Sequence, residues 1–249
     1  MLFNKDKKYL DAPVSDAANF LRQTKISMEL PENIILCPVG ALTKTVENNY
    51  KTKRAKLGLE GDVYFFEKHN CAFMTNFGMG APNIAMTMEI LIALGAKNFA
   101  LTGFAGSLQK YLNVGDIVIC SSALRDEGVS SSYAAPGDFS YPDENLTGKL
   151  KAAFEKQNLP CKYGPTWTTD VLFRETAAEI THYQKQKVLT VEMEAAAAFA
   201  VAARYKTSCA AVFAVSDQLA NLKWEPAFGH ASIDGAMQKI LKTILAVFN

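Results

Sequence analysis

Several features are scarce in this chain of 249 residues, and each scarcity excludes a class of protein. Five widely separated cysteines with no Cys-x-x-Cys pair, and three histidines without ligand spacing, argue against a disulfide framework and a metal site. A formal net charge of +1 gives no general attraction to nucleic acid or to an anionic membrane. No apolar run is long enough to span a bilayer, and residues 1–12 do not resemble a secretory signal, which favours a cytoplasmic protein.

The hydrophobic residues, 49% of the chain, form short apolar runs that alternate with helical patterns. The runs predict strands at residues 34–37, 71–76, 99–102, 116–121, 162–168, 188–191 and 208–215. Helical spacing predicts helices at residues 83–94, 144–157, 194–205 and 233–248, and at 16–24 with Ser15 as the N-cap. This alternation is typical of an α/β fold with a largely parallel sheet and helices on both faces. Because residues 63–66 and 71–76 favour a β-hairpin, we expect a mixed, mostly parallel central sheet in a single domain over residues 1–249.

Glycine and acidic residues stand at the ends of these predicted strands. Glycine lets the backbone approach a ligand, and carboxylates at strand ends lie where open α/β sheets bind small polar molecules. In chain order the motifs are Gly78-Met-Gly80-Ala-Pro82, Gly103-Phe-Ala-Gly106, Val114-Gly-Asp116, Glu192-Met-Glu194 before an alanine-rich helix, and Ser216-Asp217 after an apolar strand. Together they resemble the purine nucleoside and uridine phosphorylase family, which includes related nucleosidases, over about residues 34–217.

The resemblance implies cleavage of the N-glycosidic bond of a purine-type nucleoside. Glu194 would accept the ribose hydroxyls and Met193 would pack under the ribose, whereas Glu192 would either help the site or only cap the helix. Asp217 would supply the proton or hydrogen bond to the leaving base. The base pocket would be lined by Leu172, Phe173 and Ser216, with buried core as the alternative for Leu172 and Phe173. The loop at residues 173–176 lacks the Gln and Arg pair of uridine-specific members, which favours a purine.

The phosphate end departs from the family pattern. Family members hold phosphate with arginines and a Ser or Thr, because a dianion needs cationic donors. The corresponding positions here are Gly40, Leu101, Gly103 and Phe104, which predicts an altered site that holds phosphate weakly. The basic run at residues 51–56 is interpreted as a solvated helix face or loop, or as an anion clamp in which Lys53 and Arg54 act from a neighbouring subunit or grip a nucleotide 5′-phosphate.

Three functions stay open on this evidence. Phosphorolysis is the family default, hydrolysis by a nucleosidase is its close rival, and a catalytically impaired nucleoside-binding protein is the third. The expected partner is a small-molecule nucleoside, with no cofactor apart from phosphate as a co-substrate. Relatives of this type assemble, so we expect a homo-oligomer, either a dimer or a hexamer.

Overall fold

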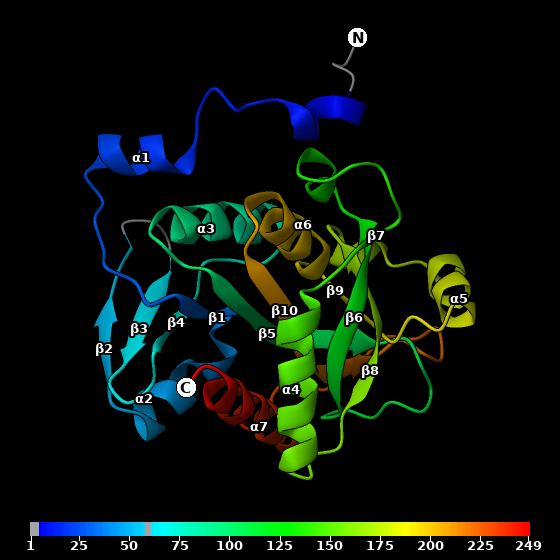
Figure 1. Cartoon of the computed structure of the whole chain (residues 1–249). Helices are drawn as coiled ribbons and strands as arrows, with labels where there is room; N and C mark the ends of the chain where they lie inside the picture. The colour runs from blue at the N-terminus through cyan, green and yellow to red at the C-terminus, as the bar shows by residue number, and fades with distance from the viewer. Residues whose placement is uncertain (1–4, 58–60) are drawn as a thin grey trace.

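The computed structural model of the protein describes residues 5–57 and 61–249, and their strands join in one sheet with helices on two sides (Figure 1). The strands are β1 Asn33–Cys37, β2 Thr52–Ala55, β3 Asp62–Phe66, β4 Cys71–Thr75, β5 Asn98–Ser107, β6 Ile117–Asp126, β7 Phe139–Ser140, β8 Lys162–Thr169, β9 Thr190–Glu192, β10 Ser208–Gln218 and β11 Glu225–Pro226. The α-helices are α1 Ala17–Thr24, α2 Thr43–Asn49, α3 Ala81–Ala93, α4 Glu144–Lys156, α5 Ala177–Lys185, α6 Ala195–Tyr205 and α7 Ala231–Val247. Short 3-10 turns lie at Lys5–Leu10, Gly40–Leu42, Ser130–Ser132 and Leu172–Arg174.

The sheet is mixed, as predicted. β1 lies parallel to β4 and β5, and β5 lies parallel to β10, whereas β3 runs antiparallel to both β2 and β4. β10 also pairs with β6, and β6, β8 and β9 lead back to β5, so these strands close into a ring that the sequence did not predict. The parallel strands β1, β4, β5 and β10 all end at the same edge. The residues that follow them are therefore brought together there.

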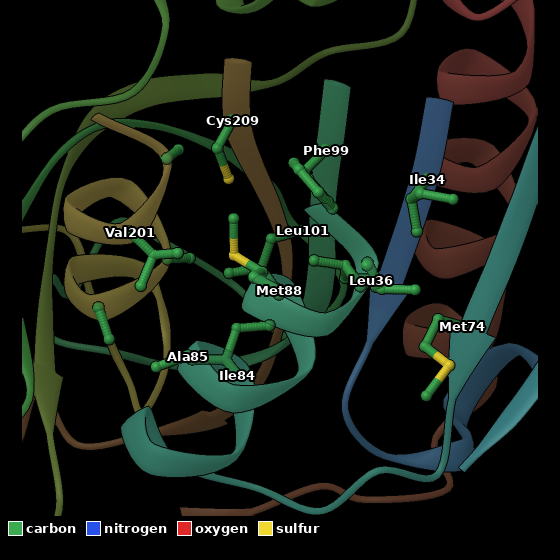
Figure 2. Packing of buried hydrophobic residues seen from close by; sticks show 14 of the residues in the cluster. Ile34, Leu36, Met74, Ile84, Ala85, Met88, Phe99, Leu101, Val201 and Cys209 are labelled. Carbon is green, nitrogen blue, oxygen red and sulfur yellow. The ribbon is translucent and has the colours of Figure 1, made fainter. Parts of the chain in front are cut away.

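Helices cover both faces of the sheet. On one face α3 and α6 pack Met88 and Val201 against Phe99 and Leu101 of β5 (Figure 2). On the other face α4 and α7 pack against β10 and β6. The first alanines of α6, residues 195–198, are all completely buried, and their small side chains let this helix lie close to its neighbours. Within the part of the chain described, none of the helices combines the length and the hydropathy needed to cross a bilayer.

The structure corrects two predictions at the N-terminal side. Asp16, not Ser15, caps α1, because its carboxylate oxygen accepts the Asn19 N–H at 2.7 Å. The basic run at residues 51–56 is neither a helix face nor a loop, since Thr52–Ala55 forms the edge strand β2 beside β3. Exposed charged side chains are typical of such an edge, because they discourage pairing with another chain. The hairpin of β3 and β4 is confirmed.

Candidate active site

A cavity of about 280 Å³ opens at the edge where β1, β5 and β10 end. Its lining includes the predicted residues Leu101, Gly103, Phe104, Leu172, Glu192, Met193, Glu194, Ser216 and Asp217. These residues come from segments more than a hundred positions apart, and the parallel strands bring their ends to one place. Gly40, Phe173, Lys53 and Arg54 are not among the lining residues, and each has a different environment described below.

Glu192 is bound by the start of α6. One carboxylate oxygen accepts the Thr168 hydroxyl at 2.5 Å, and the other accepts the N–H groups of Glu194 at 2.8 Å and Ala195 at 2.7 Å. The first N–H groups of a helix have no partner within the helix, so this carboxylate satisfies them and complements the helix dipole. Of the two roles left open for Glu192, helix capping is the one that these contacts display.

Glu194 connects the acidic motif before α6 to the glycine-rich motif before α3 through a hydrogen bond. Its Oε1 accepts the N–H of Gly80, the N-cap residue of α3, at 2.6 Å. Gly80 has a φ of 96°, a conformation that favours glycine, so the residue type and the contact depend on each other. Burial raises the pKa of the Glu194 carboxyl group, and burial together with repulsion from Glu194 raises the pKa of Glu192. Adjacent buried carboxyl groups of this kind gather at functional sites.

Asp217 is held in place by two donors. Its Oδ1 accepts the hydroxyl of Ser216 at 2.6 Å, and its Oδ2 accepts the indole N–H of Trp224 at 2.9 Å. Trp224 precedes β11, which turns back to pair with the end of β10, so a short hairpin carries the indole to the carboxylate. A Cβ at Gly106 would lie 2.9 Å from Oδ2 and 2.5 Å from Leu219, so only glycine leaves room for this arrangement. Each carboxylate oxygen keeps a second lone pair for a ligand.

Two side chains of the loop after β8 lie in different environments, one in the cavity and one in an adjoining hollow. Leu172 lines the cavity as predicted, but Phe173 is 85% exposed and lies in an adjoining hollow with Leu219 and Trp224. Both residues belong to one tight 3-10 turn, in which successive side chains point in different directions. In this structure Phe173 therefore lies outside the cavity lining, and its contact with the base stays a prediction.

The predicted phosphate end is apolar. Leu101 is 1% exposed, and the Phe104 ring lies 6.3 Å from that of Phe228, which in turn lies 6.4 Å from that of Trp224. No Lys, Arg or His lines this cavity in the described part of the chain. Gly40 is not part of the lining, whereas its neighbours Pro38 and Val39 are, and a Cβ at Gly40 would lie 2.6 Å from Asn76 Oδ1.

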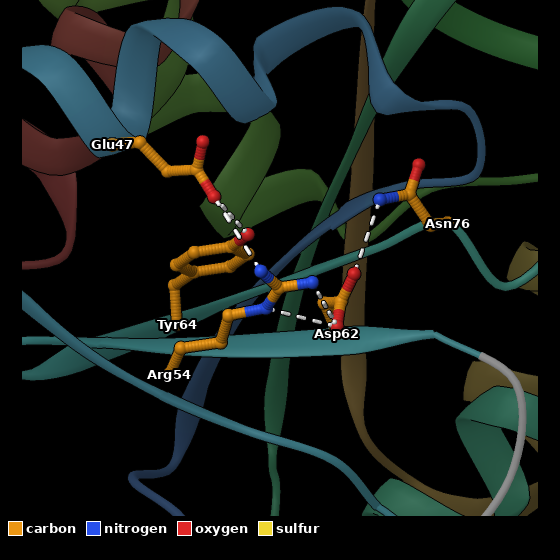
Figure 3. A network of polar contacts seen from close by, with 5 residues as sticks. All are labelled: Glu47, Arg54, Asp62, Tyr64 and Asn76. Carbon is orange, nitrogen blue, oxygen red and sulfur yellow. Dashed lines mark hydrogen bonds and ion pairs between the residues drawn. The ribbon is translucent and has the colours of Figure 1, made fainter.

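Arg54 is engaged by its own chain. Its Nε and Nη2 donate to Asp62 Oδ1 at 3.1 and 2.9 Å, and Asn76 donates to the other Asp62 oxygen at 3.3 Å (Figure 3). Its Nη1 lies 3.8 Å from Glu47 Oε1, which also accepts the Tyr64 hydroxyl. Within this chain Arg54 is thus paired away from the cavity, and Lys53 is exposed on the same edge strand. The sequence pattern did not reveal Asp62 as the partner, because the two residues meet only when β2 and β3 pair.

The lining residues that were not predicted as site residues include Met79, Glu175, Trp224 and Phe228. Glu175 follows Arg174 in the loop after β8, a mixed run of polar and apolar residues that gave no local signal for a site. Burial, and secondarily the charge of Asp217, raise its pKa to about 7. Trp224 and Phe228 carried no local signal, because their position depends on the return of β11 along β10.

Known proteins resemble this chain in sequence and in structure. Guanosine phosphorylase of Halorubrum lacusprofundi is 30% identical over 142 residues, 57% of this chain and 59% of that protein. The DeoD-type purine nucleoside phosphorylase of Brevibacillus brevis is 29% identical over 173 residues, 68% of this chain and 72% of that protein. The purine nucleoside phosphorylase of Toxoplasma gondii, solved with immucillin-H, shares the fold with a TM-score of 0.79 at 20% identity, covering 89% of this chain and 92% of its own.

Uridine phosphorylase of Vibrio fischeri has the same fold with a TM-score of 0.76 at 20% identity, over 88% of this chain and 92% of its own. These likenesses confirm the predicted fold class and the prediction of a nucleoside phosphorylase-like enzyme. The model of the family described as the phosphorylase superfamily matches residues 34–248, a stretch that contains every strand end and carboxylate of the cavity. The chain belongs to the phosphorylase superfamily.

Proposed function

We propose that this protein cleaves the N-glycosidic bond of purine nucleosides in the cavity at the ends of β1, β5 and β10. The observation that carries the proposal is that Glu194 and Asp217, both less than a tenth exposed, line one cavity together. Glu194 accepts the ribose hydroxyls while the sugar gains oxocarbenium character, and Asp217 interacts with the departing base. The names of the related guanosine and purine nucleoside phosphorylases support a purine as the base.

The acceptor of the sugar follows from the charges around the cavity. Phosphorolysis needs a bound phosphate dianion, and a dianion that leaves water needs cationic or N–H donors in exchange. The lining supplies carboxylates, the hydroxyls of Thr102 and Ser216, the Trp224 indole and apolar groups but, among the residues described, no cation. Water needs no such donors. Hydrolysis is therefore the second candidate reaction, and within the purine proposal we favour weak dependence on phosphate.

One experiment separates these reactions. The purified protein is incubated with guanosine, inosine, adenosine and uridine, with and without phosphate, and the released sugar is identified. Ribose 1-phosphate demonstrates phosphorolysis, free ribose demonstrates hydrolysis, and nucleoside binding without release identifies an impaired binding protein. Release from uridine alone would contradict the purine assignment.

The remaining expectations accompany this proposal. The reaction proposed here uses no metal or organic cofactor, since the carboxylates and the substrate supply its groups. A homo-oligomer and a cytoplasmic location stay predictions, and the oligomer is measured by light scattering of the purified chain.

A further inference from the structure

A second hollow, of about 190 Å³, adjoins the cavity. Three residues line both spaces: Leu172, Glu175 and Trp224. Phe173 and Leu219 line the hollow but not the cavity. Because the two spaces share these walls, part of a ligand that is bound in the cavity can extend into the hollow.

The walls of the hollow are mostly apolar. The indole N–H of Trp224 is already donated to Asp217, so the rest of the ring is what a ligand can contact. Glu175 is the one charged residue among the described residues that line the hollow, and burial raises its pKa to about 7. An ion or a strongly polar group would find few partners here, whereas an apolar group would lose none.

Several of these apolar side chains are exposed to solvent. Phe173 is 85% exposed, Trp224 47% and Leu172 37%. Single exposed apolar residues are ordinary on a protein surface, but a contiguous group of them beside a ligand cavity marks a binding surface. An apolar group that covers them is stabilised by the hydrophobic effect.

The position of the hollow indicates which part of a nucleoside reaches it. Leu219 directly follows β10, two residues after Asp217, and Trp224 is hydrogen-bonded to that carboxylate. In the proposed function Asp217 interacts with the base, and Glu194 and Met193 hold the ribose. Neither Glu194 nor Met193 lines the hollow. A group that enters it is therefore attached to the base and not to the ribose.

The volume is sufficient for a six-membered ring, since an apolar cavity of about 150 Å³ engineered in another protein binds benzene. We propose that the hollow binds an apolar substituent of the purine base, of up to about benzyl size, so that the substrates include purine nucleosides alkylated on an exocyclic amino group. Phe173 and Leu219 contact the substituent and not the base itself. The inference rests on the proposed nucleoside-cleaving function.

The test compares N6-benzyladenosine with adenosine and N2-benzylguanosine with guanosine. The unchanged protein should favour at least one benzylated nucleoside over its parent by about 10-fold in kcat/KM, the lower end of the range for burying an aromatic side chain. The preference should appear in KM, because the substituent lies away from the bond that breaks. Phe173→Ala, which removes one wall, should lower this preference by about 3- to 10-fold.

Two controls accompany this test. Val171→Ala changes an exposed apolar residue of the same loop that lines neither space, and it should leave the preference unchanged. The second control, 5′-benzylthio-5′-deoxyadenosine, carries the benzyl group on the ribose, and Phe173→Ala should not alter its kcat/KM relative to adenosine. The inference is overturned if neither benzylated base is favoured, if Phe173→Ala keeps the preference, or if either control responds as strongly as the test.

A binding measurement separates the inference from the proposed function. If no nucleoside is cleaved, the proposed function fails, and calorimetric titration with N6-benzyladenine, N2-benzylguanine and their parent bases then decides the role of the hollow. Tighter binding of a benzylated base than of its parent, lost in Phe173→Ala, supports the inference. Equal binding of benzylated and parent bases, or binding of none, overturns it.

Discussion

Replacing Glu194 with glutamine should stabilise the ligand-free protein and at the same time weaken catalysis. The amide oxygen can still accept the N–H of Gly80, so the contact to α3 survives while the charge is removed. Burial raises the pKa of Glu194 from 4.5 to about 7, and one pKa unit corresponds to about 1.4 kcal/mol. The ionised carboxylate thus lowers the free energy of unfolding by roughly 3 kcal/mol above pH 7.

The size of this stabilisation depends on pH. Because the folded state binds the Glu194 proton more tightly than the unfolded state, the contribution of Glu194 to the free energy of unfolding is fully present below pH 4.5. It falls as the pH rises to about 7. Glutamine does not titrate, so the variant should melt about 6–12 °C higher than the unchanged protein at pH 8.5, at about 2–4 °C per kcal/mol. The two melting temperatures should converge at about pH 4.

The same variant should lose about 10- to 100-fold in kcat/KM for nucleosides, because a neutral amide replaces a charged acceptor for the ribose hydroxyls. Thermal melts test the predicted gain in stability, and initial rates measured on the same preparation test the predicted loss of activity. Glu67→Gln, at an exposed position outside the cavity lining, is the control and should change neither. A variant that melts below the unchanged protein at pH 8.5, or a difference that is the same at both pH values, would refute the reasoning.

Three further outcomes are expected. Asp217→Asn should lower turnover of purine nucleosides about 100-fold with little change in melting temperature, and unchanged initial rates would place the proton donor elsewhere. Trp224→Phe, which removes the N–H donated to Asp217, should lower kcat and alter its pH profile while KM changes little; a change in KM alone would argue against a positioning role. Omitting phosphate should leave the rate of base release nearly unchanged, and a reaction that stops without phosphate contradicts the apolar site. Arg54→Ala should lower the melting temperature but should not make the rate of base release depend on phosphate.

Much of the candidate site was predictable because its residues obey local requirements. Gly80 sits where a strand turns into a helix with a positive φ, and Glu192 precedes a helix whose first N–H groups need an acceptor. Because residues close together in the sequence satisfy these local requirements, a short sequence motif is enough to predict them. The strands and the main helices were predictable for a similar reason, since burial on one face imposes a regular spacing of apolar residues.

The sequence alone thus determined the α/β class, the family, and the strand ends at which Glu194 and Asp217 stand. Only the tertiary structure decided the closed ring of β5, β6, β8, β9 and β10, the pairing of Arg54 with Asp62, and the arrival of Trp224 at Asp217. The physical reason is the range of the interactions. Helix starts and glycine turns are specified by a few adjacent residues, whereas these contacts arise when separate strands pair and carry side chains from one strand to another.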